Sequence, residues 1–112
     1  MQTIWLISKE KLVYTREGGS HTLAGQLKVL AGVRNIAYEK KVGMRYSIDC
    51  FQHVTDVYGQ WSRQVNPEIE EFLLLSKSDI PVGASLQFAL FYQVAGETYW
   101  DSNNGNFYSI YF

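Results

Sequence analysis

A run of aromatic, acidic and amide side chains near the carboxyl end of this 112-residue sequence has the composition of a sugar-binding site: Tyr99-Trp100-Asp101-Ser102-Asn103-Asn104-Gly105. A sugar ring presents an apolar C–H face and a rim of hydroxyls. A site for it needs flat aromatic rings for stacking and planar amides or carboxylates for hydrogen bonding. Trp100 and the polar residues after it supply both. A second interpretation stays open, because Asn-Asn-Gly is also typical of a tight turn between strands.

Catalytic and metal-binding constellations are weaker in this sequence. His53 precedes Asp56 by three residues and lies near Ser62, but no Gly-x-Ser-x-Gly elbow accompanies them. His21 and His53 are far apart, and Cys50 is the only cysteine, which excludes an intramolecular disulfide and a cysteine-based zinc cluster. Glycine-rich phosphate-binding spacing is missing as well. We therefore expect a non-catalytic protein without a metal or cofactor.

A basic cluster raises the alternative of nucleic-acid binding, because Lys and Arg interleaved with tyrosines can neutralise and stack on a single strand. The cluster comprises Arg34, Lys40, Lys41 and Arg45. Nearby Glu39 and Asp49, a net charge of −1 and a pI of about 6.1 favour a solvated strand edge instead. The apolar patch from Ile4 to Ile7 is too short for a membrane span. Neither nucleic acid nor a membrane is an expected partner.

Alternation of apolar and polar residues identifies the elements that must position these groups, because successive side chains of a strand point to opposite faces. The two clearest segments are Val42–Cys50 and Leu86–Val94, and Phe91 on the polar face of the second indicates partial cover there. Turn residues separate shorter strand candidates, which are Thr3–Ile7, Lys11–Thr15, Gly25–Val29, Phe72–Leu75 and Phe107–Phe112. About seven short strands predict an antiparallel sandwich, and the length predicts a single domain over residues 1–112.

Two irregular features are expected within this pattern. Proline at a first helical position and acids in a first turn favour one helical turn over Pro67–Glu71. The alternation loses its period over Val29–Val33, where Gly32 interrupts a strand-like run, and this predicts a β-bulge.

Two ordered blocks make the sequence similar to the family 21 carbohydrate-binding modules. These modules occur as starch-binding domains of fungal glucoamylases and as glycogen-binding domains of type 1 protein phosphatase targeting subunits. The first block runs from Asn35 through Val42 to Asp49, with Phe51 where the family usually has Trp. The second comprises Phe88–Tyr92, Gly96, Tyr99–Asp101, Asn103, Gly105 and Tyr108.

The resemblance implies an all-β, antiparallel immunoglobulin-like β-sandwich of about eight strands that presents two sugar sites. In the first site, Trp100 and Phe51 would stack on sugar rings. The hydrogen-bonding groups beside them would come from Asp101, Asn103 and Asn104. The expected ligand is an α-1,4-glucan such as starch, glycogen or a cyclodextrin.

Departures from the family pattern concentrate in this first site. Ser102 replaces an Asn and Phe107 replaces another, which removes two amides that could bind hydroxyls. Phe51 keeps a stacking face but lacks the indole donor of Trp. Ala89 stands where some members carry a stacking Tyr. We expect the first site to be the weaker one.

The second site matches the family better. The resemblance assigns it to Asn35, Tyr38 and Lys40, although Tyr38 taken alone could also be an edge aromatic of the core. A further aromatic from the middle of the chain usually joins this site. The candidates are Tyr58, Trp61 and Phe72.

Partners other than glucan follow from the resemblance alone. One alternative function is a protein-interaction module that contacts glycogen synthase, and docking of type 1 protein phosphatase would require a larger parent chain. The cellular location depends on that parent, being cytoplasmic for a phosphatase targeting subunit and secreted for a glucoamylase. The sequence leaves starch and glycogen equally open.

Overall fold

The computed structural model describes residues 2–15 and 23–112. In these ranges the chain forms strands and no helix, so nothing there is a helix that could cross a membrane. The strands are β1 (Ile4–Thr15), β2 (Leu23–Arg34), β3 (Lys40–Ser47), β4 (Thr55–Tyr58), β5 (Gln60–Asn66), β6 (Ile69–Leu75), β7 (Ile80–Pro81), β8 (Ser85–Val94), β9 (Glu97–Asp101) and β10 (Tyr108–Tyr111).

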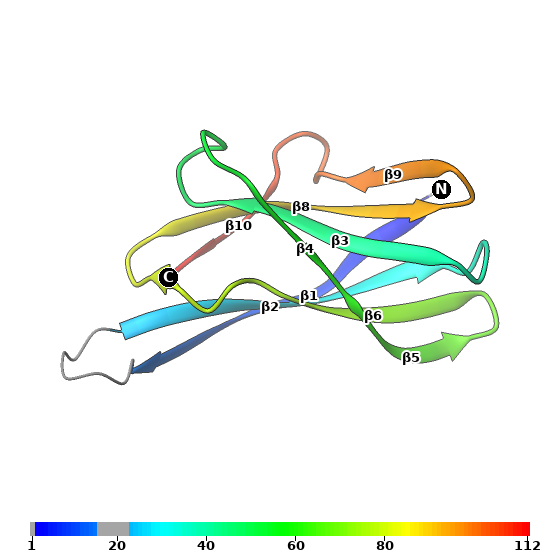
Figure 1. Cartoon of the computed structure of the whole chain (residues 1–112), viewed down its shortest axis with the longest axis horizontal. Helices are drawn as coiled ribbons and strands as arrows, with labels where there is room; N and C mark the ends of the chain where they lie inside the picture. The colour runs from blue at the N-terminus through cyan, green and yellow to red at the C-terminus, as the bar shows by residue number, and fades with distance from the viewer. Residues whose placement is uncertain (1, 16–22) are drawn as a thin grey trace.

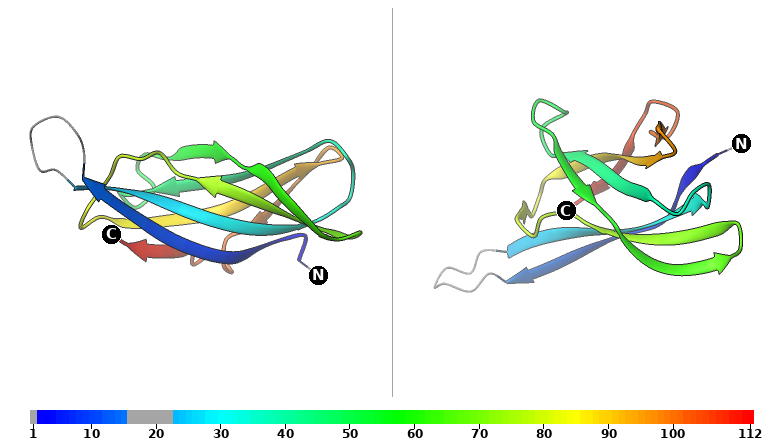
Figure 2. Two further views of the ribbon diagram at one scale, coloured as in Figure 1. Left: turned by 90° about the horizontal axis from the view of Figure 1, so that it is seen from below. Right: turned by 45° about the vertical axis from the view of Figure 1, so that its right-hand side comes forward.

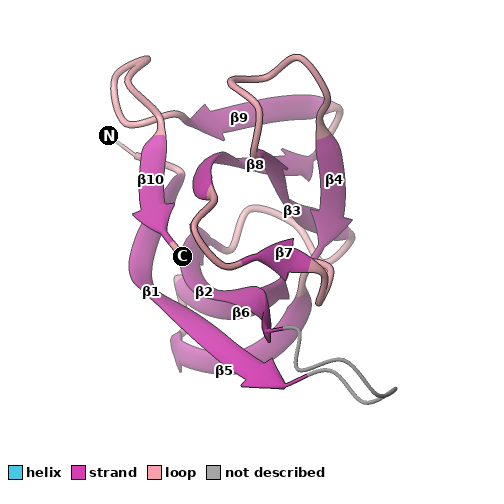
Figure 3. Cartoon of the chain, turned by 90° about the vertical axis from the view of Figure 1, so that its left-hand side faces the viewer, coloured by secondary structure: helices cyan, strands magenta, loops and turns pink. Residues whose placement is uncertain are grey.

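These strands build two antiparallel sheets that form the two layers of a sandwich (Figure 1 and Figure 3). The first sheet has the order β1-β2-β6-β5, with β7 paired to β2. The second sheet has the order β10-β8-β3-β4, with β9 paired to β8. The expected antiparallel β-sandwich is confirmed. The number of described strands exceeds eight because β9 and the two-residue β7 stand as separate short strands.

The core between the sheets is built by the alternating residues. In β3 and β8 the even-numbered apolar side chains point inward, and in β2 and β6 the inward set includes Val29, Val33 and Leu74. The contributions of the second sheet are Val42, Met44, Tyr46, Leu86, Phe88, Leu90, Tyr92 and Val94. Each large side chain buried in this way stabilises the fold by about 1.5–3 kcal/mol. A one-residue slip would expose the whole set, so burial fixes the strand register.

β4 links the two sheets and leaves one side of the sandwich open. It pairs with β3 only from Thr55 to Tyr58. The Gly59 N–H then donates to the Val42 carbonyl at 2.7 Å, and the chain passes to the first sheet as β5. Figure 1 shows β4 crossing diagonally between the layers. The start of β3, at Lys40 and Lys41, therefore lies beyond its pairing with β4.

The expected helical turn over Pro67–Glu71 is wrong. Pro67 and Glu68 form the tight turn of the β5–β6 hairpin, and β6 begins at Ile69. The side-chain Oδ1 of Asn66 accepts a hydrogen bond from the Glu68 N–H at 2.9 Å, which holds this turn. The segment forms a strand despite its local helix signals because β6 pairs with β2 on one edge and with β5 on the other.

The irregularity predicted over Val29–Val33 lies on the opposite strand. The pairing of β1 with β2 shifts between Leu6 and Ser8, so Ile7 of β1 is the extra residue and β2 runs on without interruption. The two short strands expected over Thr3–Ile7 and Lys11–Thr15 are accordingly one long bulged strand.

The outer face of the second sheet carries a close approach that only glycine permits. A Cβ atom placed on Gly43 would lie 2.1 Å from Cζ of Phe91, whose ring is buried on this outer face. Phe91 thus lies flat across the neighbouring strand. This explains why an aromatic residue stands on the otherwise polar side of β8.

We predict that Gly43→Ala lowers the free energy of unfolding by about 1–3 kcal/mol, because the added methyl forces Phe91 out of its place. Urea denaturation measures this change. In a double-mutant cycle with Phe91→Leu the two losses should be smaller in combination than their sum, since the shorter side chain relieves the clash. Full additivity would contradict this account.

Candidate functional site

The main concave feature near the predicted residues is a groove of about 700 Å³ at the open side of the sandwich. It lies between the start of β3 in one sheet and strands β5 and β6 in the other. Figure 2 shows the β2–β3 connection beside the β5–β6 hairpin at this end of the molecule. The lining residues are Tyr38, Glu39, Lys40, Lys41, Trp61, Glu70 and Phe72.

The polar centre of the groove is the ammonium group of Lys40. Its side chain is only 8% exposed. The Nζ atom donates to Oδ1 of Asn35 at 2.8 Å and forms an ion pair with Glu70. The other carboxylate oxygen of Glu70 accepts a hydrogen bond from Nε1 of Trp61 at 3.0 Å. Glu70 therefore holds both the cation and the indole ring in place.

Two aromatic rings stand open beside this polar centre. Tyr38 is 96% exposed and Trp61 is 57% exposed, whereas Phe72 is buried and forms part of the groove wall. A ring as exposed as that of Tyr38 does not pack in the core. The interpretation of Tyr38 as an edge aromatic of the core is therefore excluded. Of the three aromatic candidates, Trp61 and Phe72 line the groove, and of these two only Trp61 is exposed. Tyr58 lies on the outer face of the second sheet.

Glu70 is the groove residue that sequence reasoning missed. On β6 it faces the same way as Phe72 and Leu74, so it is a charged residue on the inward-facing side of a strand. This inward-facing position is the sequence signal that could have identified Glu70, because a carboxylate that faces the core of a sandwich needs a partner. The expectation of a helical turn over this segment concealed the alternation.

The predicted residue Trp100 belongs to a different surface, the outer face of the second sheet. Its ring centroid lies 5.2 Å from that of Phe91, which in turn lies 5.7 Å from that of Tyr58. The guanidinium carbon of Arg45 sits 5.2 Å from the Trp100 ring centroid, which is a cation–π contact. We call Tyr58, Phe91 and Trp100 the aromatic row.

Arg45 is fixed in this position by Asp56. Nε and Nη2 of Arg45 donate to the two carboxylate oxygens of Asp56 at 2.8 and 3.0 Å. These bonds raise the pKa of Arg45 and lower the pKa of Asp56. Asp56, Ser62 and His53, which could have formed a catalytic triad, have separate partners, since Ser62 donates to Glu71 and His53 pairs with Asp49.

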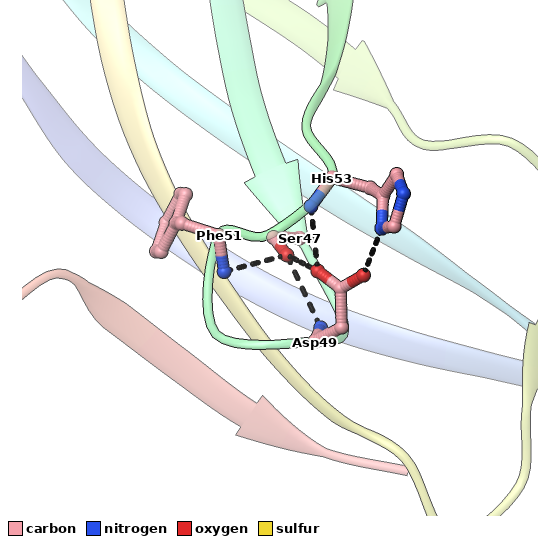
Figure 4. A network of polar contacts seen from close by, with 4 residues as sticks. All are labelled: Ser47, Asp49, Phe51 and His53. Atoms are coloured by element: carbon pink, nitrogen blue, oxygen red, sulfur yellow. Dashed lines mark hydrogen bonds and ion pairs between the residues drawn. The ribbon is translucent and has the colours of Figure 1, made fainter.

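The β3–β4 loop carries Phe51 and is organised by Asp49 and Ser47 (Figure 4). The Ser47 hydroxyl donates to Asp49 and accepts from the Phe51 N–H at 3.0 Å, while Asp49 also accepts from the His53 N–H at 3.0 Å. These bonds, led by that from Ser47, hold the pKa of Asp49 well below its usual range. Phe51 packs on Phe107 of the β9–β10 loop, with ring centroids 4.4 Å apart.

In the amide-rich loop after β9, Asp101 points into the protein, whereas Asn103 and Asn104 are exposed. Asp101 is buried, and its carboxylate accepts from the Tyr108 hydroxyl at 2.8 Å and from the Asn103 N–H at 3.2 Å. Nδ2 of Asn103 donates to the Phe107 carbonyl at 3.2 Å. Asn103 and Asn104 have φ values of 53° and 58°, the left-handed conformation that asparagine tolerates. Asp101 and Asn103 thus shape the turn, and Asn104 lies exposed at its tip.

We predict that Tyr108→Phe destabilises the protein by about 1.5–3 kcal/mol at neutral pH, because the buried Asp101 carboxylate loses a hydrogen-bond donor. Burial and the Asp101 contact raise the pKa of Tyr108 from 10.0 to about 12. A raised pKa in the folded state stabilises the protein below pH 10, and this contribution is lost between pH 10 and pH 12. Denaturant titrations at several pH values should show the difference between the two proteins narrowing over that interval, whereas a constant difference would contradict this role of the phenol.

Comparison with known proteins identifies the family of this chain. A family model described as carbohydrate/starch-binding module (family 21) matches residues 7–111, and the chain belongs to this family.

Among curated proteins, the chain is 31% identical over 96 residues to protein phosphatase 1 regulatory subunit 3E of Rattus norvegicus, covering 84% of this chain and 33% of that protein. It is 32% identical over 90 residues to regulatory subunit 3B of Homo sapiens, covering 74% of this chain and 32% of the relative. Glycogen-binding subunit 76A of Drosophila melanogaster is 33% identical over 89 residues, covering 77% and 12%. The chain thus spans a third or less of these relatives.

Two solved structures share the fold. The carbohydrate-binding module of the muscle glycogen-targeting subunit of protein phosphatase-1 matches with a TM-score of 0.68 and 25% identity, covering 96% of this chain and 74% of that one. The starch-binding domain of Rhizopus oryzae glucoamylase, solved in complex with β-cyclodextrin and maltoheptaose, matches with a TM-score of 0.70 and 21% identity. That match covers 98% of this chain and 93% of the other.

Proposed function

We propose that this module binds α-1,4-glucan, and that its principal site is the groove formed by Asn35, Tyr38, Lys40, Trp61 and Glu70. The observation that carries the proposal is the pair of exposed rings, Tyr38 and Trp61, flanking an almost fully covered cation. Exposed aromatic faces beside fixed polar groups match the two-sided chemistry of a sugar ring.

Each groove residue has a separate task in this proposal. The rings of Tyr38 and Trp61 stack on the C–H faces of glucose units. Lys40 has three N–H donors, of which two are used by Asn35 and Glu70, so one donor is left for a sugar hydroxyl. The amide nitrogen of Asn35 supplies a further donor beside it. Because Glu70 fixes Lys40 and Trp61 beforehand, little side-chain entropy is lost on binding.

The similar proteins support the class of ligand. One structure with this fold was solved with β-cyclodextrin and maltoheptaose, and the curated relatives include a glycogen-binding subunit. Both starch and glycogen present α-1,4-linked glucose chains, and the groove chemistry does not distinguish them.

The surface around Trp100 contributes a second, weaker contact. Phe91 and Arg45 already touch its ring, the Asp101 carboxylate is buried, and the exposed Asn103 amide donates to the Phe107 carbonyl. Trp100 therefore offers a stacking face with few of the amide partners that the sequence suggested. Asn104 is exposed in the loop that follows β9, and Phe51 packs on Phe107 of the same loop.

The biological role proposed is that of a non-catalytic tether. In this role the module holds a parent chain on polysaccharide and raises the local concentration of an attached partner. The phosphatase regulatory subunits among its relatives favour type 1 protein phosphatase as that partner, with glycogen synthase as a protein that the module could also contact.

We predict that Tyr38→Ala and Trp61→Ala each weaken binding of maltoheptaose by about five- to tenfold, the loss expected from one stacking contact of about 1 kcal/mol. Isothermal titration calorimetry measures the affinity, and circular dichroism checks the fold. Tyr111→Ala is the matched control, because Tyr111 is an exposed tyrosine on β10 that lines none of the groove. Equal losses in all three variants, or none in the groove variants, would contradict the assignment.

A further inference from the structure

We propose that Arg45 binds sugar directly on the outer face of the second sheet, where its guanidinium donates to two neighbouring hydroxyls of a glucose unit stacked on Trp100. Asp56 acts through Arg45 and is a positioning residue. This inference rests on the function proposed above. It adds to that function the groups that bind hydroxyls beside Trp100.

The surface at Trp100 has an open ring but lacks the hydrogen-bonding partners expected beside it. Trp100 is 48% exposed, and the buried ring of Phe91 packs against it with centroids 5.2 Å apart. The Asp101 carboxylate is buried, and the Asn103 amide donates to the Phe107 carbonyl. A sugar that stacks on the ring still has a rim of hydroxyls to satisfy. The donors for that rim must come from another element.

Strand register brings Arg45 to this ring. Arg45 on β3 is paired with Ala89 on β8, and Phe91, two residues further along β8, is paired with Trp100 on β9. Side chains two residues apart on a strand share a face, so all four lie on the outer face. Ala89 has only a methyl side chain, which leaves room for Arg45 to extend over β8. Its guanidinium carbon lies 5.2 Å from the Trp100 ring centroid, so one glucose unit on the ring is within reach of both.

Asp56 holds the guanidinium from β4, on the other side of β3. Nε and Nη2 of Arg45 donate to its two carboxylate oxygens at 2.8 and 3.0 Å. A guanidinium has five N–H donors. In the part of the chain that the structure describes, no further acceptor is bonded to this one, so the donors of Nη1 remain for a ligand. The Arg45 side chain is 42% exposed, and a ligand can therefore approach it.

A pair of neighbouring hydroxyls is the ligand that this arrangement favours. The planar guanidinium presents its N–H groups side by side and can bond two oxygens at once. An inner unit of an α-1,4-glucan is linked through its first and fourth carbons, so the hydroxyls on its second and third carbons are free and adjacent. Asp56 balances the charge of Arg45, which favours a neutral ligand over an anion. Ring and guanidinium thus bind the C–H face and the rim of one sugar.

The test reads the two sugar contacts separately, by tryptophan fluorescence with maltotriose. The Trp61→Phe variant leaves Trp100 as the reporter of the outer face, and the Trp100→Phe variant leaves Trp61 as the reporter of the groove. Trp5 is common to both, with its ring against Gly32 in the first sheet. Into each reporter we introduce Arg45→Met, which keeps a long side chain but removes every N–H donor. We expect the midpoint reported by Trp100 to rise by about tenfold and that reported by Trp61 to stay unchanged.

Three further variants separate sugar binding from a structural role of the ion pair. Asp56→Ala removes the ion pair but keeps the donors of Arg45, and should raise the Trp100 midpoint by only about threefold, through lost preorganisation. Arg45→Lys keeps a charge without the planar fork and should fall between wild type and Arg45→Met. Arg63→Met is the matched control, because Arg63 is an exposed arginine paired with Glu71 in the first sheet. It should leave both midpoints unchanged.

Circular dichroism checks the fold of each variant. A wild-type Trp100 midpoint in folded Arg45→Met or Arg45→Lys, or equal shifts of both reporters, would overturn the role of Arg45. Equal losses in Arg45→Met and Asp56→Ala would also overturn it, since the ion pair alone would then account for the effect. A response of Trp61 without any response of Trp100 would overturn this inference and leave the groove in place. If neither tryptophan responds and maltoheptaose gives no calorimetric heat, the proposed function itself is wrong.

Discussion

The ion pair between Lys40 and Glu70 joins the two sheets at the point where they separate, and the candidate site depends on it. Lys40 begins β3 in one sheet and Glu70 lies on β6 in the other. Removing two charges from water is costly unless hydrogen bonds complete their coordination. Asn35 and Trp61 supply those bonds, so one network sets the position of the cation, an amide and an aromatic ring. The same contacts that pair the buried charges at the open edge of the sandwich therefore also shape the groove.

The polar residues that look most suited to binding sugar in the sequence mainly stabilise the loops of the protein. Asp101 receives hydrogen bonds from Tyr108 and from the backbone of Asn103, and Asn103 reaches back to the Phe107 carbonyl. Likewise, Asp49 and Ser47 bind each other and the backbone of their own loop. Short polar side chains readily satisfy nearby backbone groups in this way. Open aromatic rings are the better mark of the surface available to a ligand.

The sequence predicted the strands well where apolar inward-facing residues alternate with mostly polar or small ones. β3 and β8 were identified by this alternation of residue type, whereas β5 is exposed along its whole length and gave no such pattern. The sequence could not decide whether Tyr58 or Trp61 lines the groove, because the answer depends on the chain passing from one sheet to the other at Gly59. Asn35, Tyr38 and Lys40 were found together through family resemblance, but their partner Glu70 emerges only from the pairing of β6 with β2.

The contact between Phe51 and Phe107 fastens two loops whose backbones are both unusual. Phe51 has φ of 64° and Phe107 has φ of 60°, a conformation that costs an ordinary L-residue roughly 1–2 kcal/mol. Asparagine, which the family resemblance leads one to expect at residue 107, adopts that conformation more readily. In this chain a ring takes the place of an amide and packs on its neighbour. A position suited to hydrogen bonding with hydroxyls thus becomes an aromatic contact that joins the β3–β4 loop to the β9–β10 loop.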